Sequence, residues 1–160
     1  MRPVEDKILK VSSLSSAVGR RAMALGHHPF GAVLVAPDHQ TVLFTQCNID
    51  TVNHAESTLA RIAASNYPAE YLWQCTLYTA VEPCCMCAGT IYWANIGRVV
   101  YGMTEQRLLQ CTGNHQENPT MSVSSAYVFA HGQKNIDLIG PVAEIEEQTA
   151  ALQQAFWTER

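Results

Sequence analysis

The sequence predicts an α/β fold of three layers, in which helices cover both faces of a central mixed sheet of about five strands. Two observations lead to this class. Hydrophobic residues make up 48% of the 160 residues, which is enough for one domain with its own core. After an N-terminal helix and a hairpin, helix-like and strand-like segments alternate, which favours one sheet between two helical layers. We therefore expect residues 1–160 to form a single domain.

The first part of the chain predicts a helix, a hairpin and a second helix. Apolar residues between positions 4 and 25 recur at helical spacing, and Gly26 ends the run. Two short β-rich runs, 31–36 and 41–45, flank a turn sequence and indicate a hairpin. Residues 54–65 return to helical composition and stop before the Asn-Tyr-Pro sequence at 66–68.

The second part predicts alternating strands and helices. Residues 75–80 are typical of a buried strand, and Pro83 suits the first turn of a helix that extends to about Asn95. The remaining predictions are a strand over 98–103, a short helix over 104–110, a polar loop over 113–120, a strand over 135–139 and a helix over 143–157.

Composition and charge exclude several functional classes. Charged residues make up only 15% of the chain, too few for a disordered protein, and no apolar run approaches the roughly 18 residues of a membrane span. No apolar signal core follows the first residues, so we expect a cytoplasmic protein without a membrane partner. The formal net charge is −4, which favours a small molecule over a nucleic acid as the partner.

The cysteine pattern indicates a metal site. Of six cysteines, three lie within four residues, at Cys84, Cys85 and Cys87. Without a secretory signal, metal binding or plain burial is favoured over disulfides. Cys84 and Cys87 are three residues apart, so they share one face of a helix. A helix N-terminus also favours the thiolate form, which binds metal.

A second segment, His54-Ala55-Glu56, supplies what the cysteines lack for catalysis. Two thiolates and one imidazole are three ligands for a tetrahedral Zn²⁺ and leave a fourth position for water. Glu56 can then stand beside that water and carry protons. H-x-E followed by P-C-x-x-C is the known signature of zinc deaminases. The alternatives are two buried cysteines beside an unrelated histidine, or a structural zinc. The obvious fourth ligand of a structural zinc is Cys85, which points about 100° away from Cys84 on a helix.

The chain resembles the cytidine deaminase-like superfamily of zinc nucleobase deaminases, and within it the small bacterial guanine deaminases. The resemblance extends from about Pro29 to Met103 and more loosely to the C-terminus. The segments that carry it are Pro29–Val33, Asn48, His54–Glu56, Leu77–Thr79, Glu82–Cys84, Met86-Cys87, Ile91–Ala94 and Arg98–Gly102.

The resemblance implies the fold of that superfamily, a bound Zn²⁺, a homodimer and a role for each site residue. The zinc ligands would be His54, Cys84 and Cys87, and Glu56 would be the general acid and base. Residues implied to bind the substrate are Asn48, Phe30, Ala55, Trp93 and Trp157. From the residues alone, Asn48 could equally be a turn residue, and the aromatic side chains could belong to an ordinary core.

The implied reaction is hydrolytic deamination of a free nucleobase. Guanine, giving xanthine and ammonia, is the first candidate, and ammeline or a related aminopurine fits the same chemistry. Cytosine is the second candidate and adenosine in tRNA the third, disfavoured because the last predicted helix is acidic. A protein without activity, in which zinc only stabilises an interaction module, is the non-enzyme alternative, and an intact Glu56 argues against it.

Guanine deamination needs protons at both the ring nitrogen and the leaving amine, so a second carboxylate is expected. The segment 113–120 resembles a loop that supplies it in one branch of guanine deaminases, which makes Glu117 the first candidate and Glu105 the second. Glu117 could instead be a solvated loop residue. The adjacent aromatic residues Phe156 and Trp157 could cap the pocket or simply dock the last helix on the sheet.

Overall fold

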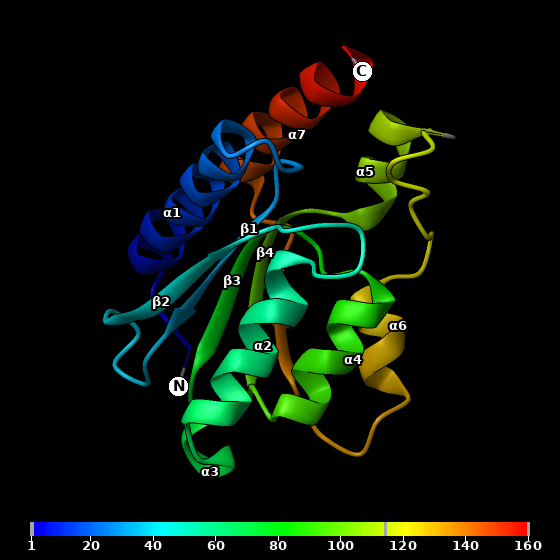
Figure 1. Cartoon of the computed structure of the whole chain (residues 1–160). Helices are drawn as coiled ribbons and strands as arrows, with labels where there is room; N and C mark the ends of the chain where they lie inside the picture. Colours follow the sequence, from blue (N-terminus) through cyan, green and yellow to red (C-terminus); the bar gives the residue numbers. More distant parts are fainter. Residues whose placement is uncertain (1, 114, 160) are drawn as a thin grey trace.

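The structure, a computed structural model, describes residues 2–113 and 115–159 and is built on a five-stranded sheet of order β2-β1-β3-β4-β5 (Figure 1). The strands are β1 (Gly31–Val35), β2 (Val42–Cys47), β3 (Thr76–Val81), β4 (Arg98–Met103) and β5 (Asp137–Ile139). β1 pairs antiparallel with both β2 and β3, whereas β4 runs parallel to β3 and β5. The predicted mixed sheet is therefore confirmed.

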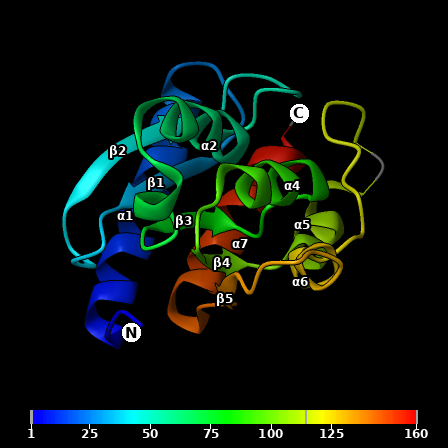
Figure 2. The same cartoon turned by 90° about the horizontal axis from the view of Figure 1, so that it is seen from below.

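Helices cover both faces of this sheet. The long ones are α1 (Glu5–Ala24), α2 (Ala55–Asn66), α4 (Cys85–Ala94) and α7 (Ala143–Thr158). α1 and α7 pack on one face, and α2 and α4 lie side by side on the other (Figure 1 and Figure 2). The predicted three-layer arrangement is confirmed. Within the described residues, no helix has both the length and the hydropathy needed to cross a membrane.

The burial of each strand explains its place in the sheet. All residues of β1 and β3 are buried, as expected for strands covered on both faces, whereas β2 is partly exposed at the edge. Adjacent residues of β1 point to opposite faces, so Leu34 packs under α2 and α4 while Val33 packs under α1. The same alternation separates Leu77 from Tyr78 in β3.

Three short helices complete the fold: α3 (Ala69–Leu72), α5 (Glu105–Thr112) and α6 (Ser125–Ala130). Only α5 was expected from the sequence. α3 and α6 have four and six residues, too few to show a hydrophobic period, and helices of this length depend on tertiary packing. α6 packs against α4, and the Ser124 hydroxyl caps it by accepting a hydrogen bond from the backbone N–H of Tyr127.

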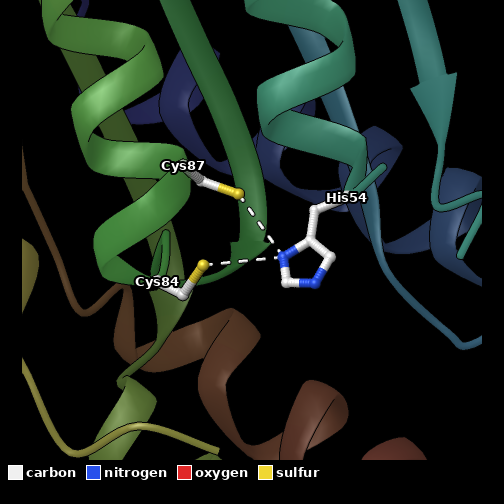
Figure 3. Close-up of side chains that lie close together, drawn as sticks. All are labelled: His54, Cys84 and Cys87. Atoms are coloured by element: carbon white, nitrogen blue, oxygen red, sulfur yellow. Dashed lines mark hydrogen bonds between the residues drawn. The ribbon is translucent and has the colours of Figure 1, made fainter. Parts of the chain in front are cut away.

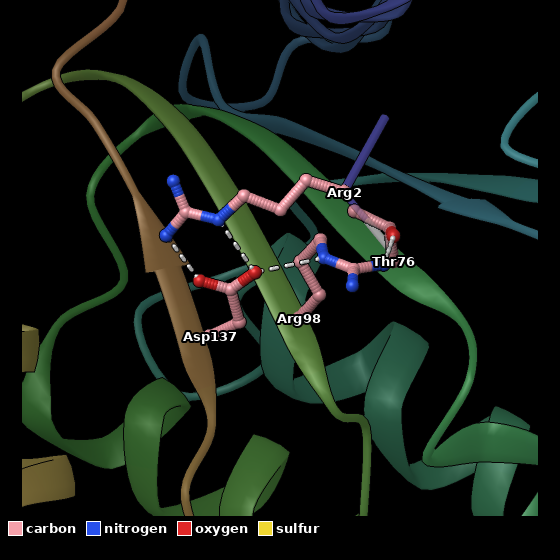
Figure 4. A network of polar contacts seen from close by, with 4 residues as sticks. All are labelled: Arg2, Thr76, Arg98 and Asp137. Atoms are coloured by element: carbon pink, nitrogen blue, oxygen red, sulfur yellow. Dashed lines mark hydrogen bonds and ion pairs between the residues drawn. The ribbon is translucent and has the colours of Figure 1, made fainter. Parts of the chain in front are cut away.

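The ends of the sheet differ in chemistry. At the end where β3, β4 and β5 begin, Asp137 accepts hydrogen bonds from Arg2 and from Arg98, and Arg98 also donates to Thr76 (Figure 4). This network ties the N-terminal segment to the edge strand β5. The carboxyl ends of β3 and β4 lie at the opposite end, beside the N-termini of α2 and α4. In open α/β sheets ligands bind beyond the carboxyl ends of the strands.

Candidate active site

Three metal-binding side chains meet between the N-termini of α2 and α4. His54 and Cys84 are the residues that immediately precede these helices, and Cys87 lies in the first turn of α4. His54 Nδ1 lies 3.5 Å from Cys84 Sγ and 3.5 Å from Cys87 Sγ (Figure 3). A tetrahedral zinc with bonds of about 2.0 Å to nitrogen and about 2.3 Å to sulfur would hold such atoms about 3.5 Å apart. The three predicted ligands can therefore hold a metal ion together.

The local backbone explains why both cysteines point to the same place. Cys84 is extended (φ −65°, ψ 172°), so α4 begins at Cys85, two residues later than Pro83, where the sequence predicted its start. Cys85 itself takes no part in the cluster, and its Sγ lies 3.3 Å from the Met121 sulfur. The group thus has three protein ligands, as in catalytic zinc sites that keep one position open.

The two thiols of the cluster differ in acidity. A hydrogen bond with Cys87 lowers the pKa of Cys84 to about 4, against the effect of burial. The same hydrogen bond, together with burial, raises the pKa of Cys87. The pair therefore retains one proton near neutral pH, and a divalent ion that binds both sulfurs would displace it.

Glu56 lies in the first turn of α2 and is 5% exposed. The hydroxyl of Thr79, on β3, donates a 2.8 Å hydrogen bond to Glu56 Oε1 and so fixes the carboxyl. Burial raises the pKa of Glu56, although the nearby His54 opposes this. A carboxyl with a raised pKa, held next to a metal-binding group, is suited to take up and return a proton.

A cavity of about 250 Å³ opens beside these residues. Ligand pockets for drug-sized molecules occupy about 300–1,000 Å³, so this cavity suits a small heterocycle. Its described wall contains no Lys or Arg. The residues that line it are His28, Phe30, Asn48, Asp50, Thr51, His54, Glu56, Val81, Glu82, Cys84, Met86, Glu105, Leu108, Glu117, Asn118, Pro119, Thr120 and Met121.

Two of the residues predicted to bind the substrate lie in this wall. Asn48 follows β2 and is 2% exposed, and its backbone N–H donates a 3.0 Å hydrogen bond to the carbonyl of Phe30. Its side-chain amide makes one long hydrogen bond, 3.4 Å, to the Asp50 carbonyl. The Asn48 amide thus faces the cavity with capacity for a further partner, and Phe30 supplies an apolar surface next to it.

Both candidates for the second carboxylate also line the cavity. Glu117 lies on the loop after α5, and its Oε1 is 3.3 Å from His28 Nε2. Asn114, part of the same predicted loop, lies outside the described residues. Glu105 is the first residue of α5 and is 4% exposed, and burial raises its pKa to about 9.

Three other predicted substrate-binding residues do not lie in the wall. Ala55 is completely buried in the core beneath α2. Trp157 is 3% exposed and stacks edge-on behind His28 and near Phe30, so it supports the wall without reaching the cavity. Trp93 is 80% exposed on α4 and does not line the cavity of the single chain, so its role in substrate binding stays a prediction. The sequence pattern predicted the helix that carries Trp93, but it could not show which face of that helix other elements cover.

Among the wall residues that sequence reasoning missed, His28 and Glu82 hold other parts of the site in place. His28 precedes β1 and positions Glu117. Because His27 and His28 are adjacent, the sequence alone could not show which of them lines the cavity and which is an ordinary loop residue. Glu82 is 5% exposed and accepts hydrogen bonds from the Ser125 hydroxyl (2.6 Å), from the Ser125 N–H (2.8 Å) and from the Glu105 N–H (2.9 Å). In the sequence, the position of Glu82 directly before Pro83 was the signal that could have identified it as a site residue. Glu82 joins the starts of α5 and α6 to the end of β3.

A triad that can hold zinc, with a buried carboxyl and a cavity beside it, is the arrangement of a catalytic zinc site. The family defined as "Cytidine and deoxycytidylate deaminase zinc-binding region" matches residues 6–103, which is more than half of the chain. The protein belongs to this family.

Individual relatives differ in the base that they are named for. A probable cytosine deaminase of Schizosaccharomyces pombe is 29% identical over 143 residues, 88% of this chain and 86% of that protein. A guanine deaminase of Bacillus subtilis is 46% identical over 77 residues, 46% of this chain and 49% of that protein. The solved structure of a guanine deaminase from Nitrosomonas europaea covers 92% of this chain and 82% of its own with a TM-score of 0.70, at 18% identity, and so shows the shared fold.

Proposed function

We propose that the protein deaminates a free nucleobase, guanine, to xanthine and ammonia. The observation that carries this proposal is the pair of carboxyl groups on separate elements of one cavity, Glu56 beside the metal ligands and Glu117 on the opposite loop. Guanine chemistry needs protons at two positions. The sequence identity between part of this chain and the Bacillus subtilis guanine deaminase supports the choice of guanine as the base. Ammeline or another aminopurine would suit the same groups.

The proposed chemistry begins at Glu56. Zinc held by His54, Cys84 and Cys87 would supply a Lewis acid that lowers the pKa of water towards about 7. Glu56 accepts the proton of the water that attacks the amine-bearing carbon, C2 of guanine, and transfers it to the adjacent ring nitrogen. Burial raises the pKa of Glu56, which helps the carboxyl to hold the proton between the two transfers.

Glu117 and Asn48 complete the proposed site. Glu117 accepts the proton that the new hydroxyl group at C2 loses as it becomes a carbonyl, and delivers it to the amine that leaves as ammonia. His28 holds the Glu117 carboxyl in place. The Asn48 amide donates a hydrogen bond to the ring carbonyl, and Phe30 contacts the ring. No lysine or arginine in the described wall offers a partner for a phosphate, which favours a free base over a nucleotide.

Cytosine is the second candidate, and the likeness to the Schizosaccharomyces pombe protein over 88% of the chain favours it. The same triad and Glu56 would serve a pyrimidine, with Asn48 at its carbonyl. Adenosine in tRNA is the third candidate. The acidic wall and the net charge of −4 oppose the approach of a phosphate backbone.

The test is ammonia release by the zinc-loaded protein from guanine, guanosine, ammeline, cytosine, adenine and a tRNA anticodon arm that contains adenosine. Zinc content is measured on the same sample, with one zinc per chain expected. We expect guanine to give the highest kcat/KM. Turnover of cytosine or of the tRNA arm alone would overturn the choice of base, and no turnover with zinc bound would support a non-catalytic module.

We also propose that the protein is a homodimer that pairs through the outer face of α4 and α6. α4 carries no charged residue, and Trp93 and Tyr127 are 80% and 62% exposed on this side of the sheet. α4 packs against α6, and large aromatic side chains are enriched at protein interfaces. Light scattering is expected to give twice the chain mass for the wild type, and the chain mass for Trp93→Glu. A monomeric wild type would contradict the proposal.

A further inference from the structure

Glu105 presents a carboxyl group that the fold itself does not use. It opens α5 directly beyond the carboxyl end of β4, is 4% exposed and lines the cavity. Within the described part of the chain, its carboxyl oxygens make no hydrogen bond and no ion pair to protein groups, while its backbone N–H donates a 2.9 Å hydrogen bond to Glu82. Because the carboxyl lines the cavity, a ligand in the cavity can supply the hydrogen-bonding partner that the protein does not.

The surroundings of this carboxyl are negative on two sides. Glu82 lies beside it and already accepts three hydrogen bonds, so most of the roughly four acceptor sites of its carboxylate are occupied. Glu56, fixed by Thr79, lines the same cavity. No described Lys or Arg lines the cavity to balance a further negative charge. Burial is the main cause that raises the pKa of Glu105, and the charges of Cys84, Glu56 and Glu82 add to it.

A carboxyl in such a place keeps its proton at neutral pH and is therefore a hydrogen-bond donor, which an ionised carboxylate is not. This property separates Glu105 from a proton carrier, which must change its charge in each turnover. It also complements Asn48 and Phe30, which stand on the β1–β2 side of the cavity, whereas Glu105 stands on the α5 side.

We propose that Glu105 is a specificity-determining residue that binds the substrate as a neutral carboxylic acid, by donating a hydrogen bond to a carbonyl oxygen or an unprotonated ring nitrogen of the base. This inference rests on the proposed function, because it takes a nucleobase as the occupant of the cavity. The substrate class that it selects is a heterocycle with an acceptor atom on the edge that faces α5. A base that presents only N–H or C–H there would leave the buried hydroxyl of the acid without a partner.

The test compares Glu105→Gln with Glu105→Met. Glutamine keeps a neutral donor of nearly the same shape, whereas methionine keeps the length and removes the donor. With the base that the wild type deaminates best, we expect Glu105→Gln to retain KM within about twofold and Glu105→Met to raise KM about tenfold or more, each with a small change in kcat. Thermal unfolding and zinc content confirm that both variants are folded and loaded.

A binding measurement without turnover makes the result independent of catalysis. In a Glu56→Gln background, calorimetric titration of the same base should show the same loss of affinity for Glu105→Met and the same recovery for Glu105→Gln. Equal losses of kcat in both variants would identify Glu105 as a proton carrier and overturn the inference. Unchanged KM and affinity in Glu105→Met would also overturn it. A wild type that neither binds nor deaminates any base would instead contradict the proposed function and this inference together.

Discussion

The two ends of the central sheet hold buried or half-buried acidic side chains under opposite conditions. Where the parallel strands begin, Asp137 lies between Arg2 and Arg98, and although burial opposes it, their hydrogen bonds and charges lower its pKa (Figure 4). Where the strands end, Glu56 and Glu105 lie without a Lys or Arg in the described cavity wall, and burial raises the pKa of both.

The difference between the two ends shows which of them is built for stability and which for chemistry. Paired charges favour the folded state, whereas buried acids without partners oppose it. A fold tolerates the second arrangement where a ligand or a reaction needs it, since residues at functional sites break rules that hold elsewhere. The comparison can be tested by changing one group at a time at each end.

The largest effect is expected for His54→Ala. Loss of one of three ligands should remove the zinc and with it all measurable activity, and it should lower the melting temperature because metal binding stabilises the fold. Metal analysis and calorimetry are the measurements. Cys85→Ser is the matched control, since Cys85 adjoins the cluster but takes no part in it, and it should keep one zinc per chain. A zinc-loaded His54→Ala protein would contradict the ligand assignment.

Glu56→Gln should keep the metal and lose the chemistry. General acid–base groups contribute about 10²–10⁴-fold, so kcat should fall by at least about 10². Stability should be equal or higher, because glutamine removes a buried acid and can still accept the hydrogen bond from Thr79. Steady-state ammonia release and thermal unfolding on zinc-matched samples check both points. Activity near the wild-type value would remove Glu56 from the mechanism.

A smaller effect is expected for His28, which acts through Glu117. His28→Ala should lower kcat about three- to tenfold by releasing the Glu117 carboxyl, with little change in KM. His28→Gln can restore the hydrogen bond and should recover most of the rate. His131→Ala, a change of an exposed histidine outside the cavity wall, is the control. Equal rates for His28→Ala and the wild type would show that Glu117 needs no such support.

The stability of Glu105→Gln should depend on pH. The folded-state pKa of Glu105 is raised to about 9, so its contribution to stability is complete below the unfolded pKa of about 4.3 and is lost as the pH rises towards 9. Glutamine does not titrate. The melting temperature of the variant should therefore rise relative to that of the wild type as the pH increases from 5 to 9. A constant difference across this range would show that Glu105 ionises normally.

Asp137→Asn should show the opposite dependence and no loss of activity. The lowered pKa of Asp137 means that its ion pairs stabilise the fold above the unfolded pKa of about 3.9 and fail as the pH falls through the folded-state value. The variant should be less stable by about 1 kcal/mol at pH 7 and should approach the wild type below about pH 4. Thermal unfolding between pH 3 and pH 7 measures this. A gap that persists at pH 3 would contradict the ion-pair explanation.

Local patterns predicted most of the fold because they are repeated along the chain. The period of α1, the apolar runs of β1 and β3 and the turn between β1 and β2 are each visible within a few residues. The helices α3 and α6 were not predicted, since their existence depends on contacts with α2 and α4. The end of α4 was predicted to within one residue, at Asn95, whose φ of 68° ends the helix in the left-handed region.

The functional site, like the fold, has a part that local patterns predicted and a part that they did not. The metal ligands and Glu56 were predictable because two short motifs place them at helix starts, and helix starts lie at one end of an α/β sheet. The exposure of Trp93 and the buried position of Trp157 were not predictable, because burial depends on which elements pack over a residue.

The sequence by itself determined the class of fold, the triad of His54, Cys84 and Cys87, and the position of Glu56 beside it, since each follows from patterns that lie within short segments of the chain. The tertiary structure alone decided that His28 holds Glu117, that Glu82 joins the starts of two helices, and that the Glu105 carboxyl is left for a substrate. These relations join residues up to 89 positions apart. Hydrogen bonds and desolvation act over a few ångströms of space, and no local pattern in the chain records which distant residues will share that space.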